Sequence, residues 1–271
     1  MLEILRNLLG GDNAAHKVVA FPKMRNVVLD FMEEGRRKST IHMTFELDAS
    51  LILSRLDQIR AQTNRKISLT AYIAKAMAQA VKKHPHIQAY RKGAHRLVIF
   101  EDVDVTVMTQ RNVNGVKQPV PLIVRAADKQ GIVEINEFLA EGQKAPLFQD
   151  TGPMSRLEAQ FFELPRFLRR IVWFLIRRDP HLFRKVAGTV GLTAIPSKQP
   201  MRAVGTPISP MSLMLLVGIL SPQPVVKDGV VTQTQVIQMN LSADHDVTDG
   251  MQLTRFCWTL RDELYEGKFV L

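Results

Sequence analysis

One histidine and one aspartate near the C-terminus have the types and spacing that general-base chemistry requires. Asp249 stands four residues after His245, and Gly250 follows it directly. Apolar and polar side chains alternate over residues 237–244, which is the pattern of a half-buried strand, and His245 continues the apolar register. An imidazole on the protected end of a strand can take a proton from a substrate if one ring nitrogen is held and the other is free.

The same residues also have a purely structural interpretation. His245 can be a core histidine with satisfied hydrogen bonds, and Asp249-Gly250 can be only a turn that opens a helix. The pattern by itself leaves the two interpretations about even. The helix that follows is expected to be amphipathic, with an apolar face made of Leu253, Phe256, Cys257, Leu260 and Leu264.

The motif that contains these residues resembles a known active-site signature. It reads Asp244-His245-Asp246-Val247-Thr248-Asp249-Gly250, similar to the HxxxDG motif of the coenzyme A-dependent acyltransferase superfamily. That superfamily includes chloramphenicol acetyltransferases, the catalytic domains of dihydrolipoyl acyltransferases of 2-oxoacid dehydrogenase complexes, and peptide-synthetase condensation domains. The aspartate directly before the histidine is similar to the residue that dihydrolipoyl acyltransferases carry at that position. Asp246 is a departure, because an arginine or an apolar residue is commoner there.

The order of expected elements is also similar to that of dihydrolipoyl acyltransferase catalytic domains, from about residue 22 to residue 267. The resemblance implies an α/β (α+β) fold of the chloramphenicol acetyltransferase type, a two-layer sandwich in which helices cover a mixed β-sheet. We expect one catalytic domain over residues 1–271, with a tail at 1–20. The patterns predict helices at 22–35, 54–62 and 69–83 (capped by Ser68), strands at 40–48, 102–109 and 212–220, and hairpins at 86–100 and 227–229. Residues 120–142 are expected to form a strand, a loop and a helix in that order.

The resemblance implies direct acyl transfer from a coenzyme A thioester to a thiol, hydroxyl or amine acceptor, with His245 as general base. The segment GTVGLTAIP, residues 188–196, is similar to the family segment that donates a hydroxyl to the oxyanion. Thr193 falls on the hydroxyl position, where serine is usual, although it can also be an ordinary strand threonine. Because the family's site lies between subunits, the resemblance implies a homotrimer or a larger assembly of trimers, with Thr193 facing a neighbour's His245.

Asp249 is expected to support the site together with Gly250. A buried carboxylate needs a cationic partner, and Arg25 matches the place of the family's partner arginine, although it can equally be a solvated helix residue. No GxSxG nucleophile elbow is present, and Cys257 falls in mid-helix, where we expect core packing. The histidines show no metal-ligand spacing, and His84-Pro85-His86 is expected to be a surface turn.

Composition describes an ordinary globular protein of 271 residues with a formal net charge of +10. A single cysteine excludes a disulfide framework, so we expect a cytoplasmic protein. No stretch approaches the roughly 18 apolar residues that a membrane span requires. Much of the positive charge is concentrated in residues 151–187, with eight basic and three acidic side chains, so nucleic-acid binding is not inferred.

Residues 145–187 are longer than the family's usual segment and predict a basic amphipathic helical insertion. An apolar stripe runs beside arginines within 165–187, and the helix can cover a neighbouring subunit, dock a partner or lie on an anionic membrane surface. The stripe consists of Phe167, Leu168, Ile171, Phe174 and Leu175, beside Arg166, Arg169, Arg170 and Arg177.

Two other functions stay open at this point. The acceptor can be a lipoyl domain on a separate polypeptide, as in a 2-oxoacid dehydrogenase system, because no lipoyl attachment region is recognisable in this chain. Alternatively, the chain can be a non-catalytic scaffold that keeps the fold and binds partners. Glycine-rich nucleotide loops are absent, which fits a coenzyme A bound extended in a channel, but the sequence does not single out its contact residues.

Overall fold

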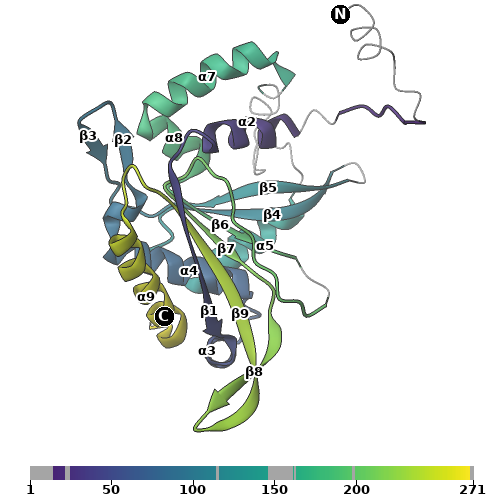
Figure 1. Ribbon diagram of the computed structural model, residues 1–271, viewed down its shortest axis with the longest axis vertical. Coiled ribbons are helices and arrows are strands. Elements are labelled where there is room, and N and C mark those ends of the chain that lie inside the picture. Colours follow the sequence, from purple (N-terminus) through teal and green to yellow (C-terminus); the bar gives the residue numbers. More distant parts are fainter. Residues whose placement is uncertain are drawn as a thin grey trace, which may run out of the picture.

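A computed structural model of the chain describes residues 15–21, 25–113, 116–145, 161, 163–196 and 199–268. Its centre is a seven-stranded mixed sheet with the order β1-β9-β7-β6-β4-β5, and β8 pairs with the first half of β9 (Figure 1). Within the described chain, the β4–β6 and β6–β7 pairs are parallel and the other pairs are antiparallel. The strands are β1 (Thr40–Asp48), β4 (Val105–Val113), β5 (Val116–Val124), β6 (Val190–Ala194), β7 (Leu213–Val217), β8 (Ser221–Lys227) and β9 (Val230–Asp244).

Helices on one face of the sheet enclose the main core. The alternating residues Ile237, Met239, Leu241 and Ala243 of β9 are buried there, as the sequence pattern predicted. The Ser68 hydroxyl accepts a hydrogen bond of 3.1 Å from the Ala71 N–H, which confirms the predicted helix cap. The helices of this layer are α3 (Ala49–Thr63), α4 (Leu69–Lys83), α5 (Ile132–Lys144) and α9 (Gly250–Glu266), and the short 3-10 turn η1 (Pro85–Gln88) follows α4.

A second, smaller group of elements packs near one end of the sheet (Figure 1). It consists of α2 (Arg25–Gly35), α7 (Arg166–Arg178), α8 (Pro180–Ala187) and the hairpin of β2 (Tyr90–Lys92) and β3 (Arg96–Val98). Because strand side chains alternate between faces, Met214 leaves the main core and joins this group. The mixed sheet covered by helices is therefore confirmed, with a partial extra layer. The second core contains Tyr90, Phe100, Trp173, Phe183, Met211 and Met214.

Several predicted boundaries differ from the observed ones. The strand predicted at 102–109 begins at Val105, because Asp104 is used in side-chain hydrogen bonds to neighbouring segments. The apolar run 212–220 forms a strand only over Leu213–Val217. Most of the predicted tail 1–20, Pro22 and residues 146–160 of the insertion lie outside the described residues. Among the helices described, none is long and apolar enough to cross a membrane.

Candidate active site

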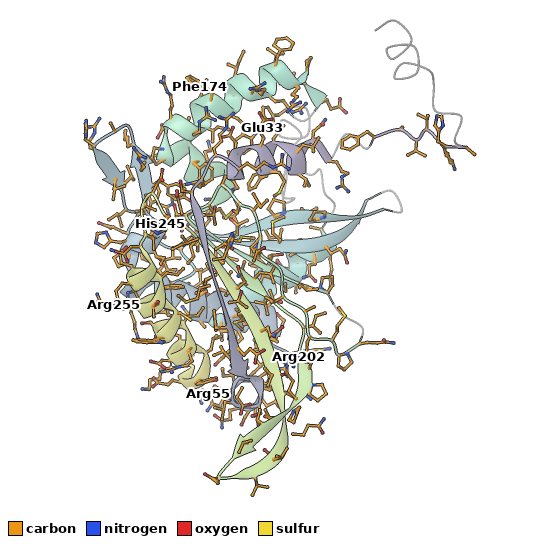
Figure 2. All side chains as sticks on the ribbon, viewed as in Figure 1. Glu33, Arg55, Phe174, Arg202, His245 and Arg255 are labelled. Carbon is orange, nitrogen blue, oxygen red and sulfur yellow. The ribbon has the colours of Figure 1, made fainter. Side chains whose placement is uncertain are left out.

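His245 lies immediately after β9, at the end of the sheet nearest α2 and α7 (Figure 2). Its backbone N–H donates a hydrogen bond of 2.7 Å to the Ser39 carbonyl. The N–H groups of Val247 and Thr248 both donate to the Asp244 carbonyl, so the chain turns as soon as the strand ends. The side chain is exposed within the single chain. The prediction that His245 continues the apolar register onto a protected face was wrong, because the strand stops one residue earlier.

Two ion pairs hold the chain on either side of His245. The buried carboxylate of Asp244 pairs with Lys38, and Asp246 pairs with Arg91 of β2 at 3.0 Å. These pairs join the strand end to the segment before β1 and to the β2–β3 hairpin. Within the described residues, the ring of His245 makes no hydrogen bond, so the imidazole is held by its backbone and remains open to a bound substrate. Sequence analysis missed Lys38 and Arg91, since neither lies in a recognisable motif.

The surroundings of Asp249 differ from the buried ion pair that was expected. It is exposed and is the N-cap of α9, with its Oδ1 accepting a 2.7 Å hydrogen bond from the Gln252 N–H. Arg25 is exposed at the start of α2, and no ion pair joins it to Asp249 in the described chain. The expectation of a buried Asp249–Arg25 pair was wrong for one chain, because both residues are exposed and α2 packs against α7.

Gly250 opens α9 without a steric need for glycine. A Cβ built there meets no atom within 4 Å, and its φ lies outside the left-handed region. Within one chain, open space therefore lies beside the HxxxDG motif, and any requirement for glycine would come from a substrate or a second subunit.

Thr193 lies in β6 and is half-buried. It pairs with Leu216 of β7, which in turn pairs with Asn240 of β9, so these three residues form one row across the sheet. His245 directly follows the end of β9, and the strand from Asn240 to Asp244 spans roughly 13 Å before the lateral separation of the strands is added. One chain therefore does not bring the hydroxyl of Thr193 to the imidazole of His245.

A cavity of ≈ 340 Å³ opens beside β6 at the start of α4. The neighbours of Thr193 in the strand, Leu192 and Ala194, both contribute to its wall, whereas Thr193 itself points to the other face. The remaining wall is mainly apolar and includes residues 217–220, with Gln199 as a polar group. This shape and lining can accommodate an extended, largely apolar substrate arm.

A second cavity of ≈ 220 Å³ lies where α4 ends and α9 begins. It is lined by Lys83, His84, His86 and Arg255 among others. Burial, followed by the charges of Lys83 and Arg255, lowers the pKa of His84, so this imidazole is neutral at neutral pH. The surface turn predicted at His84-Pro85-His86 is confirmed, and among the described residues no group of histidine, cysteine and carboxylate side chains could hold a metal ion.

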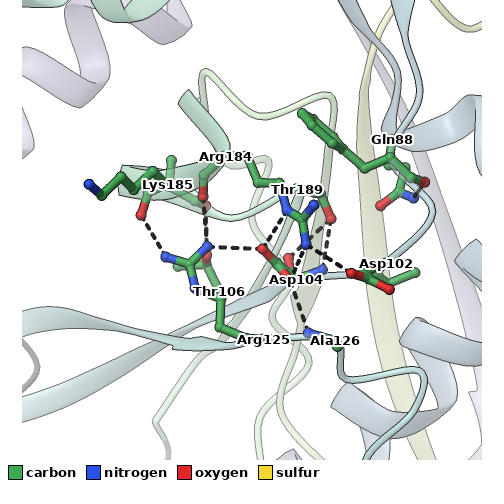
Figure 3. A network of polar contacts seen from close by, with 12 residues as sticks. Gln88, Asp102, Asp104, Thr106, Arg125, Ala126, Arg184, Lys185 and Thr189 are labelled. Carbon is green, nitrogen blue, oxygen red and sulfur yellow. Dashed lines mark hydrogen bonds and ion pairs between the residues drawn. The ribbon is translucent and has the colours of Figure 1, made fainter. Parts of the chain in front are cut away.

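A buried carboxylate, Asp104, fixes the start of β6 (Figure 3). It accepts hydrogen bonds from Arg184 Nε at 2.8 Å, Arg125 Nη1 at 2.9 Å and the Ala126 N–H at 2.9 Å. The Asp104 carbonyl also accepts from the Thr189 N–H at 2.9 Å. Burial raises the pKa of this carboxyl group, but the hydrogen bonds to Arg184, Ala126 and Arg125 outweigh burial and hold it below its usual value.

Gly188 completes this junction between α8 and β6. Its φ is +71°, and a Cβ there would lie 2.5 Å from Thr106 Oγ1, so a larger residue would be excluded both by conformation and by space. The junction is the part of the chain that determines where Thr193 lies. A buried ionic cluster of this kind has no local sequence pattern that would predict it.

Cys257 is buried in α9, as predicted. Burial raises the pKa of its thiol to about 11. The thiolate is therefore scarce at neutral pH, which excludes an activated cysteine nucleophile at this position.

Comparison with known proteins gives a consistent family assignment. The family described as 2-oxoacid dehydrogenases acyltransferase (catalytic domain) matches residues 13–146 and 204–270, leaving the insertion helices and β6 unmatched. A curated relative is the dihydrolipoyllysine-residue acetyltransferase component 5 of the chloroplastic pyruvate dehydrogenase complex of Arabidopsis thaliana, 23% identical over 252 residues. That match covers 93% of this chain but 46% of the relative, so the chain spans about half its length.

Solved structures show the same fold. The dihydrolipoamide acetyltransferase of Azotobacter vinelandii has a TM-score of 0.69 at 13% identity, with 94% of each chain covered. A serine, a histidine and an asparagine are named for the catalytic mechanism of that protein. A chloramphenicol acetyltransferase has a TM-score of 0.50 at 15% identity, covering 90% of this chain and 96% of the other. The predicted chloramphenicol acetyltransferase-like fold is confirmed.

Proposed function

Because the chain belongs to the family of 2-oxoacid dehydrogenase acyltransferase catalytic domains, we propose that it transfers an acyl group from a coenzyme A thioester to a thiol, hydroxyl or amine acceptor. The observation that carries this proposal is the position of His245. It is exposed, its backbone is fixed by Ser39, and ion pairs hold the residues on both sides. A general base that serves an incoming acceptor needs this combination of access and fixed position.

In the proposed mechanism, His245 takes the proton of the acceptor thiol, hydroxyl or amine as that group attacks the thioester carbonyl. The carbonyl oxygen becomes negatively charged, and the hydroxyl of Thr193 donates a hydrogen bond to it. When the carbon–sulfur bond breaks, the departing sulfur receives the proton from His245. The reaction therefore needs no covalent acyl-enzyme, which agrees with the buried, protonated state of Cys257.

We propose that Thr193 and His245 act together across the boundary between two chains, in a homotrimer or a larger assembly of trimers. Their separation along the sheet of one chain supports this arrangement. A second support is sequence spacing. The interval from Thr193 to His245 equals that from the serine to the histidine named for the Azotobacter protein, and the interval from His245 to Asp249 equals that from its histidine to its asparagine.

The cavity beside β6 is the proposed location for the pantetheine arm of the substrate. Coenzyme A supplies the activated thioester, and this part of it is extended and mostly uncharged. Leu192 and Ala194 line the cavity and flank Thr193 in the strand. The lining therefore fits an uncharged arm. Because Thr193 points to the other face of the sheet, the thioester carbonyl would lie outside this cavity, on the Thr193 side.

A dihydrolipoyl group carried on another polypeptide is the acceptor to test first. The curated Arabidopsis relative is named for acetyl transfer involving a dihydrolipoyllysine residue, and the exposure of His245 would allow an acceptor carried by a separate protein to approach. If this acceptor is correct, an isolated lipoyl domain should give a higher kcat/KM than free dihydrolipoamide.

The proposal is tested with purified chain, acetyl-coenzyme A and dihydrolipoamide, with released coenzyme A quantified by chromatography. We expect His245→Ala to lower kcat by about 10²–10⁴-fold, the usual contribution of a positioned base. His95→Ala, which changes an exposed histidine in the β2–β3 turn, is the matched control and should keep wild-type activity. No transfer by the wild type to any thiol, hydroxyl or amine in an acceptor panel would favour a non-catalytic scaffold.

A further inference from the structure

Helix α7 turns Arg169 inward beside Trp173, and most of its apolar stripe faces outward. The guanidinium of Arg169 is only 5% exposed and pairs with Asp30 of α2, which is 4% exposed. Arg169 Nε donates to one Asp30 carboxylate oxygen at 2.8 Å and Nη2 to the other at 3.3 Å, and Nη1 donates to the Leu164 carbonyl at 2.6 Å. An amphipathic helix ordinarily buries its apolar stripe, so this orientation requires a specific cause.

Further ion pairs to α2 supply that cause. Arg177 Nη1 donates to both carboxylate oxygens of Glu34, at 2.8 and 2.7 Å, and Arg166 pairs with Glu33 at 3.0 Å. The hydrogen bond from Arg166 lowers the pKa of Glu33, which keeps the carboxylate charged. The acidic side of α2 therefore sets the rotation of α7 about its axis.

The result is an outward-facing apolar surface on α7, and α8, which packs against α7, also exposes apolar side chains. Phe167 is 65% exposed, and Ile171 and Leu175 are each 55% exposed. We call this surface the outer apolar face; it consists of Phe167, Ile171, Phe174, Leu175, Leu182 and Val186. Adjacent exposed apolar side chains in this number indicate an interaction site. Phe174 is 42% exposed and lies on α7, at the end of the sheet that also carries His245 (Figure 2).

Two basic residues, Arg178 and Lys185, lie on the same helices as the outer apolar face. Arg178 lies over the Phe174 ring, with Cζ 4.5 Å from the centroid, and Lys185 is exposed on α8. Neither residue has an ion pair within the described chain. The helices themselves, Arg166–Arg178 and Pro180–Ala187, contain no acidic residue. The partner of this surface should therefore be both apolar and negatively charged.

We propose that the outer apolar face docks on an anionic lipid bilayer, with α7 lying along the membrane surface. Apolar side chains enter the boundary of headgroups and acyl chains, while Arg178 and Lys185 contact lipid phosphates. Pairing of this face with the same face of a second copy would place Arg178 and Lys185 near their own equivalents, and like charges disfavour that contact. The proposal is independent of the acyl-transfer chemistry.

The test is co-sedimentation of the full chain with vesicles of phosphatidylcholine alone or with one third phosphatidylglycerol. The wild type should bind the anionic vesicles at least tenfold more tightly than the neutral ones, and binding should weaken with added salt. Ile171→Ser/Phe174→Ser and Arg178→Glu/Lys185→Glu should each lower the bound fraction at least tenfold. Arg169 is left intact, because its substitution would disturb the packing of α7 on α2.

The matched control is Val230→Ser/Val231→Ser, which changes two exposed apolar residues at the β8–β9 turn, far from α7 (Figure 1). It should bind as the wild type does, and circular dichroism should show that all variants are folded. The proposal is overturned if Ile171→Ser/Phe174→Ser binds anionic vesicles as tightly as the wild type does. It is also overturned if Val230→Ser/Val231→Ser loses as much binding as Ile171→Ser/Phe174→Ser does. A lower oligomeric state of Ile171→Ser/Phe174→Ser in light scattering, with lipid binding unchanged, would identify the face as a subunit interface instead.

Discussion

Single residues of the HxxxDG motif have distinct physical roles. His245 is exposed, with its backbone fixed, and can exchange a proton with a substrate that arrives from outside the chain. Asp249 serves as a helix cap, and its carboxylate satisfies a backbone N–H that would otherwise lack a partner at the start of α9. The spacing within the motif therefore reflects a strand end, a turn and a helix start, and the proposed chemistry rests on the histidine alone.

Two substitutions of Asp249 distinguish its role as a helix cap from a role for its negative charge. Asp249→Ala should lower the free energy of unfolding by about 1 kcal/mol, because the Gln252 N–H loses its acceptor. Asp249→Asn should be close to the wild type, since asparagine caps helices as well as aspartate does. Urea unfolding of both variants checks this, and an unchanged midpoint for Asp249→Ala would contradict the capping role. A tenfold loss of acyl transfer in a stable Asp249→Asn variant would add a catalytic role for the charge.

At the level of elements, the junction of α8, β4 and β6 determines where the proposed oxyanion donor lies. The Asp104 carboxylate accepts hydrogen bonds from Arg125 and Arg184, which come from different segments. Arg125 also donates to the carbonyls of Arg184 and Lys185 at the end of α8. These contacts join the insertion to the sheet (Figure 3). Thr193 lies a few residues further along β6, so its position depends on this junction.

The junction predicts a pH-dependent contribution to stability. The folded-state pKa of Asp104 is below the ordinary value of 3.8, so its stabilisation is complete above the unfolded-state pKa and is lost as the pH falls through the folded-state pKa. Asp104→Asn should cost about 3 kcal/mol at pH 7, because Arg184 and Arg125 lose a buried partner. The difference from the wild type should shrink at pH 3.

Urea unfolding at both pH values measures this difference. Asp102→Asn is the matched control, because Asp102 also pairs with Arg184 but is partly exposed, so its substitution should cost less. A cost for Asp104→Asn that stays constant between pH 7 and pH 3 would contradict a role for the charged carboxylate.

For the whole molecule, the decisive feature is that the two proposed catalytic side chains lie at different places along one sheet. A rigid sheet cannot bring Thr193 to His245 of the same chain, so a working site would require a second copy. The outer apolar face of α7 and α8 lies at the His245 end (Figure 2), so membrane docking would orient that end of each chain towards the lipid.

Mixing two inactive variants tests the shared site. His245→Ala and Thr193→Ala chains, each nearly inactive alone, should recover activity when they are co-expressed, because some sites then combine an intact Thr193 with an intact His245. Random assembly at equal amounts should restore about a quarter of the sites. Coenzyme A release by the co-purified mixture is the measurement, and each variant co-expressed with itself is the control. No recovery in a confirmed mixed oligomer would place both groups in one chain or remove one of them from catalysis.

Much of the fold was predictable from the sequence, because it depends on patterns within single elements. Alternation in β9, the Ser68 cap, the β8–β9 turn and the buried face of α9 each follow from side chains a few residues apart. The family resemblance also rests on such local order. Tertiary structure alone decided the exposure of His245, the capping role of Asp249, the distance to Thr193 and the inward orientation of Arg169 on α7. These properties depend on which element ends meet in space, and sequence periodicity carries no information about that.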